Sequence, residues 1–476
     1  MAPKMTAYEK KRLENIRRNQ ELIASLKIHS TVSDLSSAAK RLRVNNSSKS
    51  YKNYSAKKKS DSPTSPVVIR RSLRARGLPP PGIGSKSDAD NSSQGGEIIL
   101  NPVKFSPRIE EPFSFKDAYQ GAPGSEREVV GCIASLQSPN EFFKFDSESC
   151  SVNPASLDIK DEHKARLVPG RIFTVKFLPR SDLKVIVAGS LFGNLAFWNV
   201  DYEESDDKEG NNGGISVYRP HSAPVSGAVF HYKNTSKIYT SSYDGFLRSM
   251  DAEKEMFDLV YRSSHAIYSL NQNPQFEDNL YFGEGNGLVN VWDHRAGRSS
   301  CAWNLHESRI NSIEFNPENL NMMATSSTDG TACIWDIRTM RRVNSKLIAT
   351  VAHKKPVHGA TFSPTGTILA TTSMDDTVGL TSGANYDDVS MVPHNNQTGR
   401  WVTKFRAMWS WEDSHLFIGN MKRGVDVISV EDKKIIMTIR RENMTAIPCR
   451  FDKNPFHVGV IAGSTSGGQV YIFTPN

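Results

Sequence analysis

Seven times between residues 189 and 473, a run of small and hydroxyl residues leads through a turn residue into an apolar strand. The clearest copies are SSTDGTACIWDIR at 326–338 and GEGNGLVNVWDHR at 283–295, and both end in Trp-Asp-x-Arg. The turn positions lie 52, 42, 43, 46, 48 and 44 residues apart, at Gly193, Gly245, Gly287, Gly330, Asp376, Gly424 and Gly468. Repeats of about 40–45 residues with this ending are typical of WD40 blades, so the pattern predicts an all-β, seven-bladed WD40 β-propeller.

The fifth residue after each turn position is expected to end the third strand of its blade. These residues are Trp198, Met250, Trp292, Trp335, Thr381, Ser429 and Phe473. Aromatic side chains at four of the positions fix the register there, whereas Thr381 and Ser429 mark degenerate copies. His306 with Asp329, and His353 with Asp375, have the spacing at which a loop histidine hydrogen-bonds a turn aspartate in WD40 blades. We interpret both pairs as structural.

The chain is longer than the ring needs. A seven-bladed propeller takes about 300 residues, so residues 169–476 are predicted to form it. Residues 7–28 predict a short helix, which either docks on a partner groove or forms only transiently. The rest of the 1–96 tail is rich in Ser, Asn, Lys, Pro and Gly and is predicted to be disordered. Residues 97–168 are more apolar, and we expect them to pack on the ring and to supply a strand to the blade that ends at Phe473.

Positive charge is concentrated in the tail. Residues 1–96 hold 20 Lys/Arg and 7 Asp/Glu, a net charge of +13, and the other 39 Lys/Arg and 44 Asp/Glu leave residues 97–476 at −5. Two clusters stand out, Lys57, Lys58 and Lys59, then Arg70, Arg71, Arg74 and Arg76. Such clusters indicate either nuclear import or phosphate contact, and both readings predict a nuclear protein.

Several classes of protein are disfavoured by the sequence. There is no run of 18 apolar residues, so no membrane partner is expected. The five cysteines are widely spaced and never form C-x-x-C, so neither a disulfide framework nor a metal site is predicted. No phosphate loop, nucleophile elbow or H-E-x-x-H motif occurs. We therefore expect a binding protein, not an enzyme, and no cofactor.

One end of the predicted ring is rich in cations although the ring as a whole is mildly acidic. The loops that precede the first strand of each blade, with the turn between second and third strands, form what we call the basic face. Convergent cations with an exposed aromatic suit phosphates and stacked bases, and scattered solvated charge is the alternative. Trp401 beside Arg400 is the candidate for a wedge or a stacking platform. The predicted DNA-binding residues there are Arg171, Arg309, Lys354, Lys355, Arg400, Trp401, Lys404, Lys422, Arg423 and Arg441.

The opposite face of the ring carries a second candidate site. Arg295 and Arg338 follow Asp293 and Asp336 on adjacent blades, directly after the two clearest Trp-Asp pairs. Each arginine offers a planar donor fork that suits carboxylates or carbonyls of a partner protein. The alternative is that the aspartates fix the turns while the arginines are merely solvated.

The segments YEKKRLENIRRNQELIASL, RRSLRARG, WDIR, HKKPVHGATFSPTG and GRWVTKFRAMW together resemble the WD repeat-containing protein 76 family, fungal relatives included. That family is sister to the small WD40 subunit of the UV-damaged-DNA-binding complex. The resemblance implies a nuclear protein that binds DNA, damaged or modified DNA included. It also implies that Arg295 and Arg338 dock the adaptor subunit of cullin-4 ubiquitin ligases. A histone or chromatin scaffold is a further alternative, although a basic histone tail would need an acidic face.

The resemblance implies specific positions as well. Arg171 and Trp303 match residues that the damage-reading subunit places near the lesion. Its wedge hairpin carries Phe-Gln-His where this chain has Gly399, Arg400 and Trp401. Because these three residues differ, the resemblance supports duplex binding by an Arg/Trp loop but not recognition of UV photoproducts.

Overall fold

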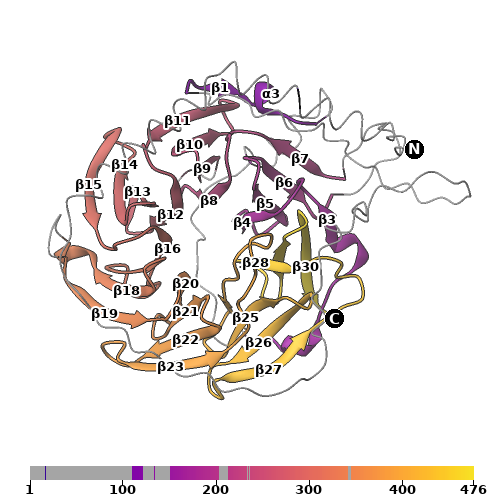
Figure 1. Cartoon of the computed structure of the whole chain (residues 1–476). Helices are drawn as coiled ribbons and strands as arrows, with labels where there is room; N and C mark the ends of the chain where they lie inside the picture. Colours follow the sequence, from indigo (N-terminus) through magenta and orange to yellow (C-terminus); the bar gives the residue numbers. More distant parts are fainter. Residues whose placement is uncertain are drawn as a thin grey trace, which may run out of the picture. The chain divides into compact units, whose positions relative to one another are not determined.

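The computed structural model describes residues 17, 110–121, 133, 151–202, 213–232, 234, 236–340 and 345–476. Seven antiparallel sheets follow one another around a ring, which confirms the predicted seven-bladed propeller (Figure 1). The predicted helix over 7–28, apart from Arg17, lies outside the described residues, as do the basic clusters of the tail. The residues of those clusters are Lys57, Lys58, Lys59, Arg70, Arg71, Arg74 and Arg76.

Each blade begins with its innermost strand and ends at the rim. The first blade comprises β4 (Ile172–Phe177), β5 (Val185–Ser190), β6 (Leu195–Asn199) and β7 (Ile215–Tyr218). The second comprises β8 (Val225–Phe230), β9 (Lys237–Ser242), β10 (Phe246–Asp251) and β11 (Met256–Arg262). The third comprises β12 (Ile267–Asn273), β13 (Phe276–Glu284), β14 (Leu288–Asp293) and β15 (Arg298–Asn304).

The remaining blades follow the same plan. The fourth comprises β16 (Ile310–Phe315), β17 (Met322–Ser327), β18 (Thr331–Asp336) and β19 (Leu347–Ala352), with a 3-10 turn η4 (Ile337–Thr339) after β18. The fifth comprises β20 (Val357–Phe362), β21 (Leu369–Ser373), β22 (Thr377–Ser382) and β23 (Asp388–Pro393). The sixth comprises β24 (Met408–Trp409), β25 (His415–Asn420), β26 (Gly424–Ser429) and β27 (Lys434–Ile439). The seventh contains β28 (Pro448–Lys453), β29 (Ile461–Thr465) and β30 (Gln469–Pro475).

The turn between second and third strands explains the glycine of the repeat. Gly287 has a φ of +84°, and a Cβ there would lie 1.9 Å from the carbonyl oxygen of His306. Only glycine fits that backbone and that space. In the sixth blade, however, Arg423 adopts the left-handed conformation with a φ of +60°, and Gly424 already belongs to β26.

The predicted register of the sixth blade is therefore wrong by one residue. Ile428 pairs with Leu416 across β25 and β26, as Trp335 pairs with Met323 in the fourth blade. Ile428, not Ser429, thus takes the position that ends the third strand, and its side chain is fully buried. The other turn positions follow the predicted alignment, each preceding its third strand.

The histidine and aspartate pairs are confirmed. Nδ1 of His306 lies 2.9 Å from Asp329, and Nδ1 of His353 lies 3.1 Å from Asp375. In the fourth blade the network continues from His306 Nε2 to Thr325, which also accepts the indole N–H of Trp335. An equivalent pair that was not predicted from the sequence joins His221 to Asp244 at 3.1 Å. These networks fix the connections between neighbouring blades.

The seventh blade is completed by residues from the beginning of the described chain. β3 (Lys164–Arg166) runs antiparallel to β30, with Ala165 opposite Val470. The shorter β2 (Leu157–Asp158) pairs with the end of β30 and lies between the 3-10 turns η2 (Pro154–Ser156) and η3 (Asp161–His163). Strands distant in sequence thus close the ring, so that the closing blade has no unpaired β30 edge.

A second N-terminal segment straps the rims of the first two blades. β1 (Phe113–Ser114) pairs with β11, and Tyr119 bridges to Tyr218 at the edge of β7. Between them the short helix α3 (Phe115–Ala118) begins at Ser114, whose hydroxyl accepts the N–H of Asp117. Phe115 is 2% exposed and contacts the rings of Phe257 and Tyr218 at 4.9 and 5.4 Å.

Truncating Phe115 should therefore destabilise the ring. Removing a buried phenyl group costs about 3–5 kcal/mol because the surrounding rings cannot collapse into the cavity. We expect Phe115→Ala to lower the free energy of unfolding by that amount in urea titrations. Phe276→Ala, at an exposed position that begins β13, is the matched control and should lower it by less than about 1 kcal/mol. Equal losses for the two variants would contradict the strap.

Candidate nucleic-acid interface

The antiparallel register places the predicted cationic loops at one end of the ring. Ile310, which begins β16, pairs with Ser327, which ends β17, so the loop carrying Arg309 and the turn at Gly330 share that end. The same arrangement recurs in the other blades, and it assembles the basic face. β14 and β18 run away from it, so Arg295 and Arg338 lie at the opposite face.

The loop between β23 and β24 presents the most exposed large aromatic side chain of the described chain. Trp401 is 74% exposed, and the guanidinium of Arg400 lies 4.7 Å from the centre of its ring system. Arg171 Nη1 donates to the carbonyl of Arg400 at 2.5 Å, and Lys404 Nζ donates to the carbonyl of Gly399 at 2.8 Å. An exposed indole with a cation on its face is thus held on an anchored loop.

Aromatic rings that were not predicted from the sequence lie beside this loop. Arg309 stacks its guanidinium 4.9 Å from the ring of Tyr268, while its Nε donates to the hydroxyl of Thr328. Tyr268 contacts Tyr243 at 4.5 Å, and Tyr243 contacts Phe173 at 5.7 Å. All three rings are half-buried, so they support the cations and leave Trp401 as the exposed stacking surface.

Four further cations of the basic face are exposed. Lys354 and Lys355 lie in the loop before β20, and the backbone N–H of Lys354 donates to Asp375, which fixes the loop. Lys422 and Arg423 form the tight turn between β25 and β26, and the carbonyl of Lys422 accepts a hydrogen bond from Arg440. Their backbones are held while their charged groups remain in solvent, which suits contact with a phosphate backbone.

Burial, together with repulsion among cations, lowers pKa values at this end of the ring. Burial and the charges of Arg171 and Arg309 lower the pKa of the Lys404 ammonium. Burial lowers the pKa of His358 to about 2, with further contributions from Arg450, Arg309, Arg406 and Lys404. His358 is therefore neutral in the folded protein at any physiological pH.

This lowered pKa predicts a pH dependence of stability. The unfolded chain protonates His358 below its ordinary pKa of 6.5, whereas the folded chain does not until about pH 2. The contribution of neutral His358 to the free energy of unfolding is thus complete above pH 6.5. It is lost as the pH falls, by up to about 1.4 kcal/mol per pH unit. We expect His358→Asn to flatten the decline in unfolding free energy between pH 6.5 and 4.5, measured by urea titration. If wild type and His358→Asn lose unfolding free energy equally between these pH values, His358 is not the source of the decline.

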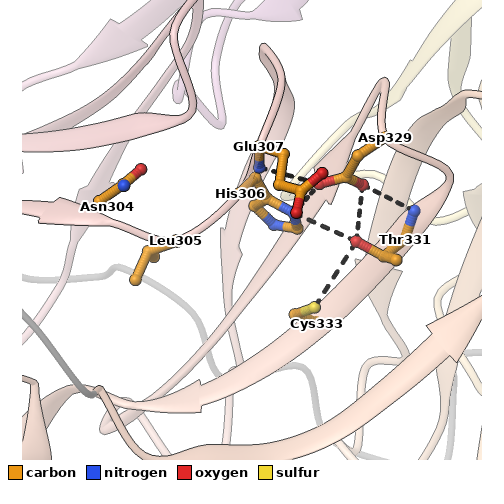
Figure 2. A pocket seen from close by; sticks show the side chains of 7 residues that line it. All are labelled: Asn304, Leu305, His306, Glu307, Asp329, Thr331 and Cys333. Atoms are coloured by element: carbon orange, nitrogen blue, oxygen red, sulfur yellow. Dashed lines mark hydrogen bonds and ion pairs between the residues drawn. The ribbon is translucent and has the colours of Figure 1, made fainter. Parts of the chain in front are cut away.

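A hollow near this end of the ring has a different character. Its volume is about 510 Å³, and Figure 2 shows His306, Asp329 and Thr331 hydrogen-bonded to one another beside Glu307. Asn304, Leu305 and Cys333 complete its lining. Its ionised groups are acidic, so it does not extend the phosphate-binding surface.

In the described part of the chain, no group of three or more His, Cys, Asp or Glu residues is arranged to hold a metal ion. Within the same residues, no helix has the length and apolar character needed to cross a membrane.

Comparisons with known proteins agree with the architecture. The model of the "WD domain, G-beta repeat" family matches residues 297–336 and 345–380. WD repeat-containing protein 76 of Xenopus laevis is 27% identical over 98% of this chain and 80% of its own length. DNA damage-binding protein CMR1 of Phaeosphaeria nodorum is 25% identical over 97% of both chains, and that of Scheffersomyces stipitis is 26% identical over 99% of both. Over nearly its full length, this chain is similar to WD repeat-containing protein 76 and to the fungal CMR1 proteins.

Two residues predicted to contact DNA make structural contacts within the protein. Trp303 lies on β15 at 7% exposure and packs against Tyr281, inside the blade core. Arg441 donates through Nε to Asp158 at 2.6 Å and through Nη2 to the carbonyl of Leu157. Trp303 is therefore a core residue, and Arg441 ties the closing strand β2 to the sixth blade. The burial of Trp303 contradicts its prediction as a DNA contact. The Arg441 side chain is 32% exposed, and it stays a predicted contact.

The opposite face presents its two arginines unequally. Arg338, 65% exposed, makes a bidentate pair with Asp336, at 3.0 Å from Nε and 2.8 Å from Nη2. Asp336 also accepts the N–H of Arg338, which fixes the η4 turn. Asp293 accepts the N–H of Ala296 at 2.8 Å, so the Arg295 side chain projects into solvent from a fixed turn. Both arginines are accessible at the ends of adjacent blades.

Proposed function

We propose that this propeller binds duplex DNA through its basic face and acts by binding, without catalysis. The observation that carries the proposal is Trp401, which stands 74% exposed on a loop anchored between Arg171 and Lys404. An indole is costly to leave in water unless it has a partner, and cations flank this one. Family members named for binding damaged DNA support the same conclusion.

The cations and the indole have separate roles in this proposal. Lys354, Lys355, Arg400, Lys422 and Arg423 neutralise phosphates of the backbone, which supplies affinity without sequence preference. Trp401 enters the base stack or receives an unstacked base, a step that costs least where pairing is already weakened. Discrimination between intact and altered duplexes thus depends on the loop, and overall affinity depends on the cations.

Removing the indole should lower affinity by a measurable amount. Stacking of one base on an aromatic side chain is worth about 1–3 kcal/mol, so Trp401→Ala should weaken duplex binding by roughly 5- to 150-fold. Trp401→Phe keeps a stacking surface and should recover most of the affinity. Fluorescence anisotropy with a labelled duplex measures both. Equal affinities for wild type and Trp401→Ala would remove Trp401 from the interface.

A competition experiment identifies the preferred DNA. Unlabelled intact, UV-damaged, methylated and oxidised-methyl duplexes of one sequence should displace the labelled duplex with different efficiencies from wild type. For Trp401→Ala we expect all four duplexes to compete equally well, because discrimination requires the loop. A ranking that survives the substitution would place discrimination elsewhere on the protein.

We propose, as a second and compatible function, that the opposite face docks the adaptor subunit of cullin-4 ubiquitin ligases. Arg295 and Arg338 support it, because both are exposed at the ends of adjacent blades and on turns fixed by their aspartates. Arg295→Ala with Arg338→Ala should lower adaptor recovery in pull-downs by roughly tenfold. Lys254→Ala with Lys433→Ala removes the same charge from the same face as a control. Unchanged recovery with the arginine variant would exclude this docking mode.

A nuclear location is also proposed, since the basic clusters of the tail suit import and a DNA-binding propeller needs access to chromatin. Alanine substitution of Lys57, Lys58 and Lys59 together with Arg70 and Arg71 tests it by microscopy of a fluorescent fusion.

A further inference from the structure

The innermost strands of the ring carry charged residues in two tiers around the axis. β4, β8, β12, β16, β20, β24 and β28 surround the axis, each in contact with its neighbours around most of the ring (Figure 1). The lower tier consists of charged residues at the fifth or sixth position of their strands. These residues are Lys176, Glu314, Asp452 and Lys453. Lys176 pairs with Asp452 at 2.9 Å, so this tier holds two basic and two acidic groups.

The upper tier is different because, among the described residues, its cations form no ion pair with a carboxylate. Arg171 and Arg309 precede β4 and β16 by one residue, Arg406 precedes β24 by two, and Arg450 is the third residue of β28. Lys404 joins them, since the charges of Arg171 and Arg309 both act on its ammonium. Among the described residues, none of these five side chains forms an ion pair. The hydrogen bonds that they donate go to neutral oxygens, such as the carbonyls of Arg400, Gly399 and His358.

Arg450 is the least satisfied of the five. Its Nε and Nη1 are buried and have no hydrogen-bond partner among the described residues. The neighbouring Arg406 is held rigidly, with Nε donating to the carbonyl of His358 at 2.6 Å and Nη2 donating to the carbonyl of Asn311. Buried donors without acceptors cost free energy, and an anion bound beside the two guanidinium groups would satisfy the donors and offset the repulsion between the charges.

The half-buried position of Lys404 makes this tier reachable from solvent. The positive charge of the upper tier comes mainly from guanidinium groups. Their several N–H donors suit the several oxygens of a phosphate better than a halide ion. The neutral His358 adds no charge but lies among the same cations. The tier is recessed below the exposed cations of the basic face, so a phosphate within a continuous duplex backbone would not fill it.

We propose that the upper tier is a binding site for a phosphate dianion, held by Arg450, Arg406 and Lys404 with Arg171 and Arg309 around it. The ligand is a phosphomonoester or free phosphate. The site goes beyond the proposed DNA-binding surface because its innermost donors, Arg450 and Arg406, are part-buried and are not among the cations proposed to contact DNA. Arg171, Arg309 and Lys404 lie where the two sites meet. The two proposals are tested separately: loss of duplex binding leaves the phosphate site possible, and loss of phosphate binding leaves duplex binding possible.

The first test measures phosphate itself. Calorimetric titration of the full chain with inorganic phosphate, at constant ionic strength, should show one site per chain. We expect its dissociation constant to rise at least roughly tenfold in Arg450→Gln and in Lys404→Gln, since each loses a charge-assisted donor. Lys404 is partly exposed, so its variant keeps the fold even if Arg450→Gln does not. Lys434→Gln, on the opposite face, should bind as wild type does. Absence of saturable binding by wild type, or equal binding by wild type and Lys404→Gln, would overturn the proposal.

The second test identifies the source of the phosphate. Two duplexes of one sequence, one with 5′-phosphate and one with 5′-hydroxyl ends, are compared for binding to wild type and Lys404→Gln. Tighter binding of the phosphorylated duplex, reduced by Lys404→Gln and by added inorganic phosphate, assigns the site to strand ends. Equal binding of the two duplexes, with phosphate titration retained, assigns it to a free phosphate compound. Loss of all duplex binding with phosphate titration retained would reject the proposed function and leave this site standing.

Discussion

Replacing Lys354, Lys355 and Arg400 together by glutamine is expected to weaken duplex binding by roughly 100-fold at about 0.15 M salt. Each cation that neutralises a phosphate releases nearly one counterion, so removing three such cations lowers affinity by about two decades at that salt concentration. All three side chains are exposed, and their loops are held by hydrogen bonds of the backbone, which the substitutions preserve. The weaker binding should therefore come from the interface and not from unfolding.

A charge-matched control separates the basic face from net charge. Lys254 and Lys433 are exposed on turns at the opposite face, and Lys434 is exposed at the start of β27 beside them. Their replacement by glutamine removes the same number of charges. Anisotropy titrations of both triple variants should show near wild-type affinity for the control. If the two variants lose affinity equally, DNA binding follows overall charge and the basic face has no special role.

Deleting residues 1–168 is expected to abolish cooperative folding of the ring. The deletion removes β2 and β3, and β3 covers Val470 and Tyr471, which are fully buried in the intact chain. It also removes the buried side chains of Leu157 and Leu167. Burial of each such side chain is worth about 1.5–3 kcal/mol, so together they approach the whole stability of a typical domain. The uncovered edge of β30 would also favour aggregation.

Urea unfolding followed by circular dichroism measures this effect against a chain that begins at residue 93, where a compact unit of residues 93–476 starts. A milder variant, Ala165→Pro, disrupts the pairing of β3 with β30 and should lower the midpoint without preventing folding. Identical unfolding curves for chains beginning at residues 93 and 169 would show that the closing strand contributes nothing.

The fold was predictable because the same conformational constraint acts on the turn residue of most blades. Glycine at Gly287 is the residue that fits both its backbone and the carbonyl of His306, and that constraint recurs with the period of the blades. The wrong register in the sixth blade has the same origin. There Arg423 tolerates the left-handed conformation, and alignment on the nearest glycine shifted the register by one residue.

The candidate site was predictable only in part. Position in a loop identified Arg400, Trp401 and Lys354, since loop residues face solvent whatever their neighbours. It could not reveal that Arg441 is held by Asp158, which is 283 residues away in sequence. Nor could it bring Arg406 and Arg450 together, because their proximity depends on how the inner strands of the sixth and seventh blades meet.

The salt dependence of duplex binding by residues 93–476 tests the central claim most directly, because it examines the propeller without the basic tail. Dissociation constants measured between 50 and 200 mM salt should give a linear plot of log affinity against log salt concentration. We predict that the Lys354, Lys355 and Arg400 glutamine variant has a slope about 3 units shallower than wild type, one unit for each phosphate that is no longer neutralised. Absence of duplex binding by wild-type residues 93–476, or equal slopes for the two proteins, would contradict the claim that the basic face binds DNA.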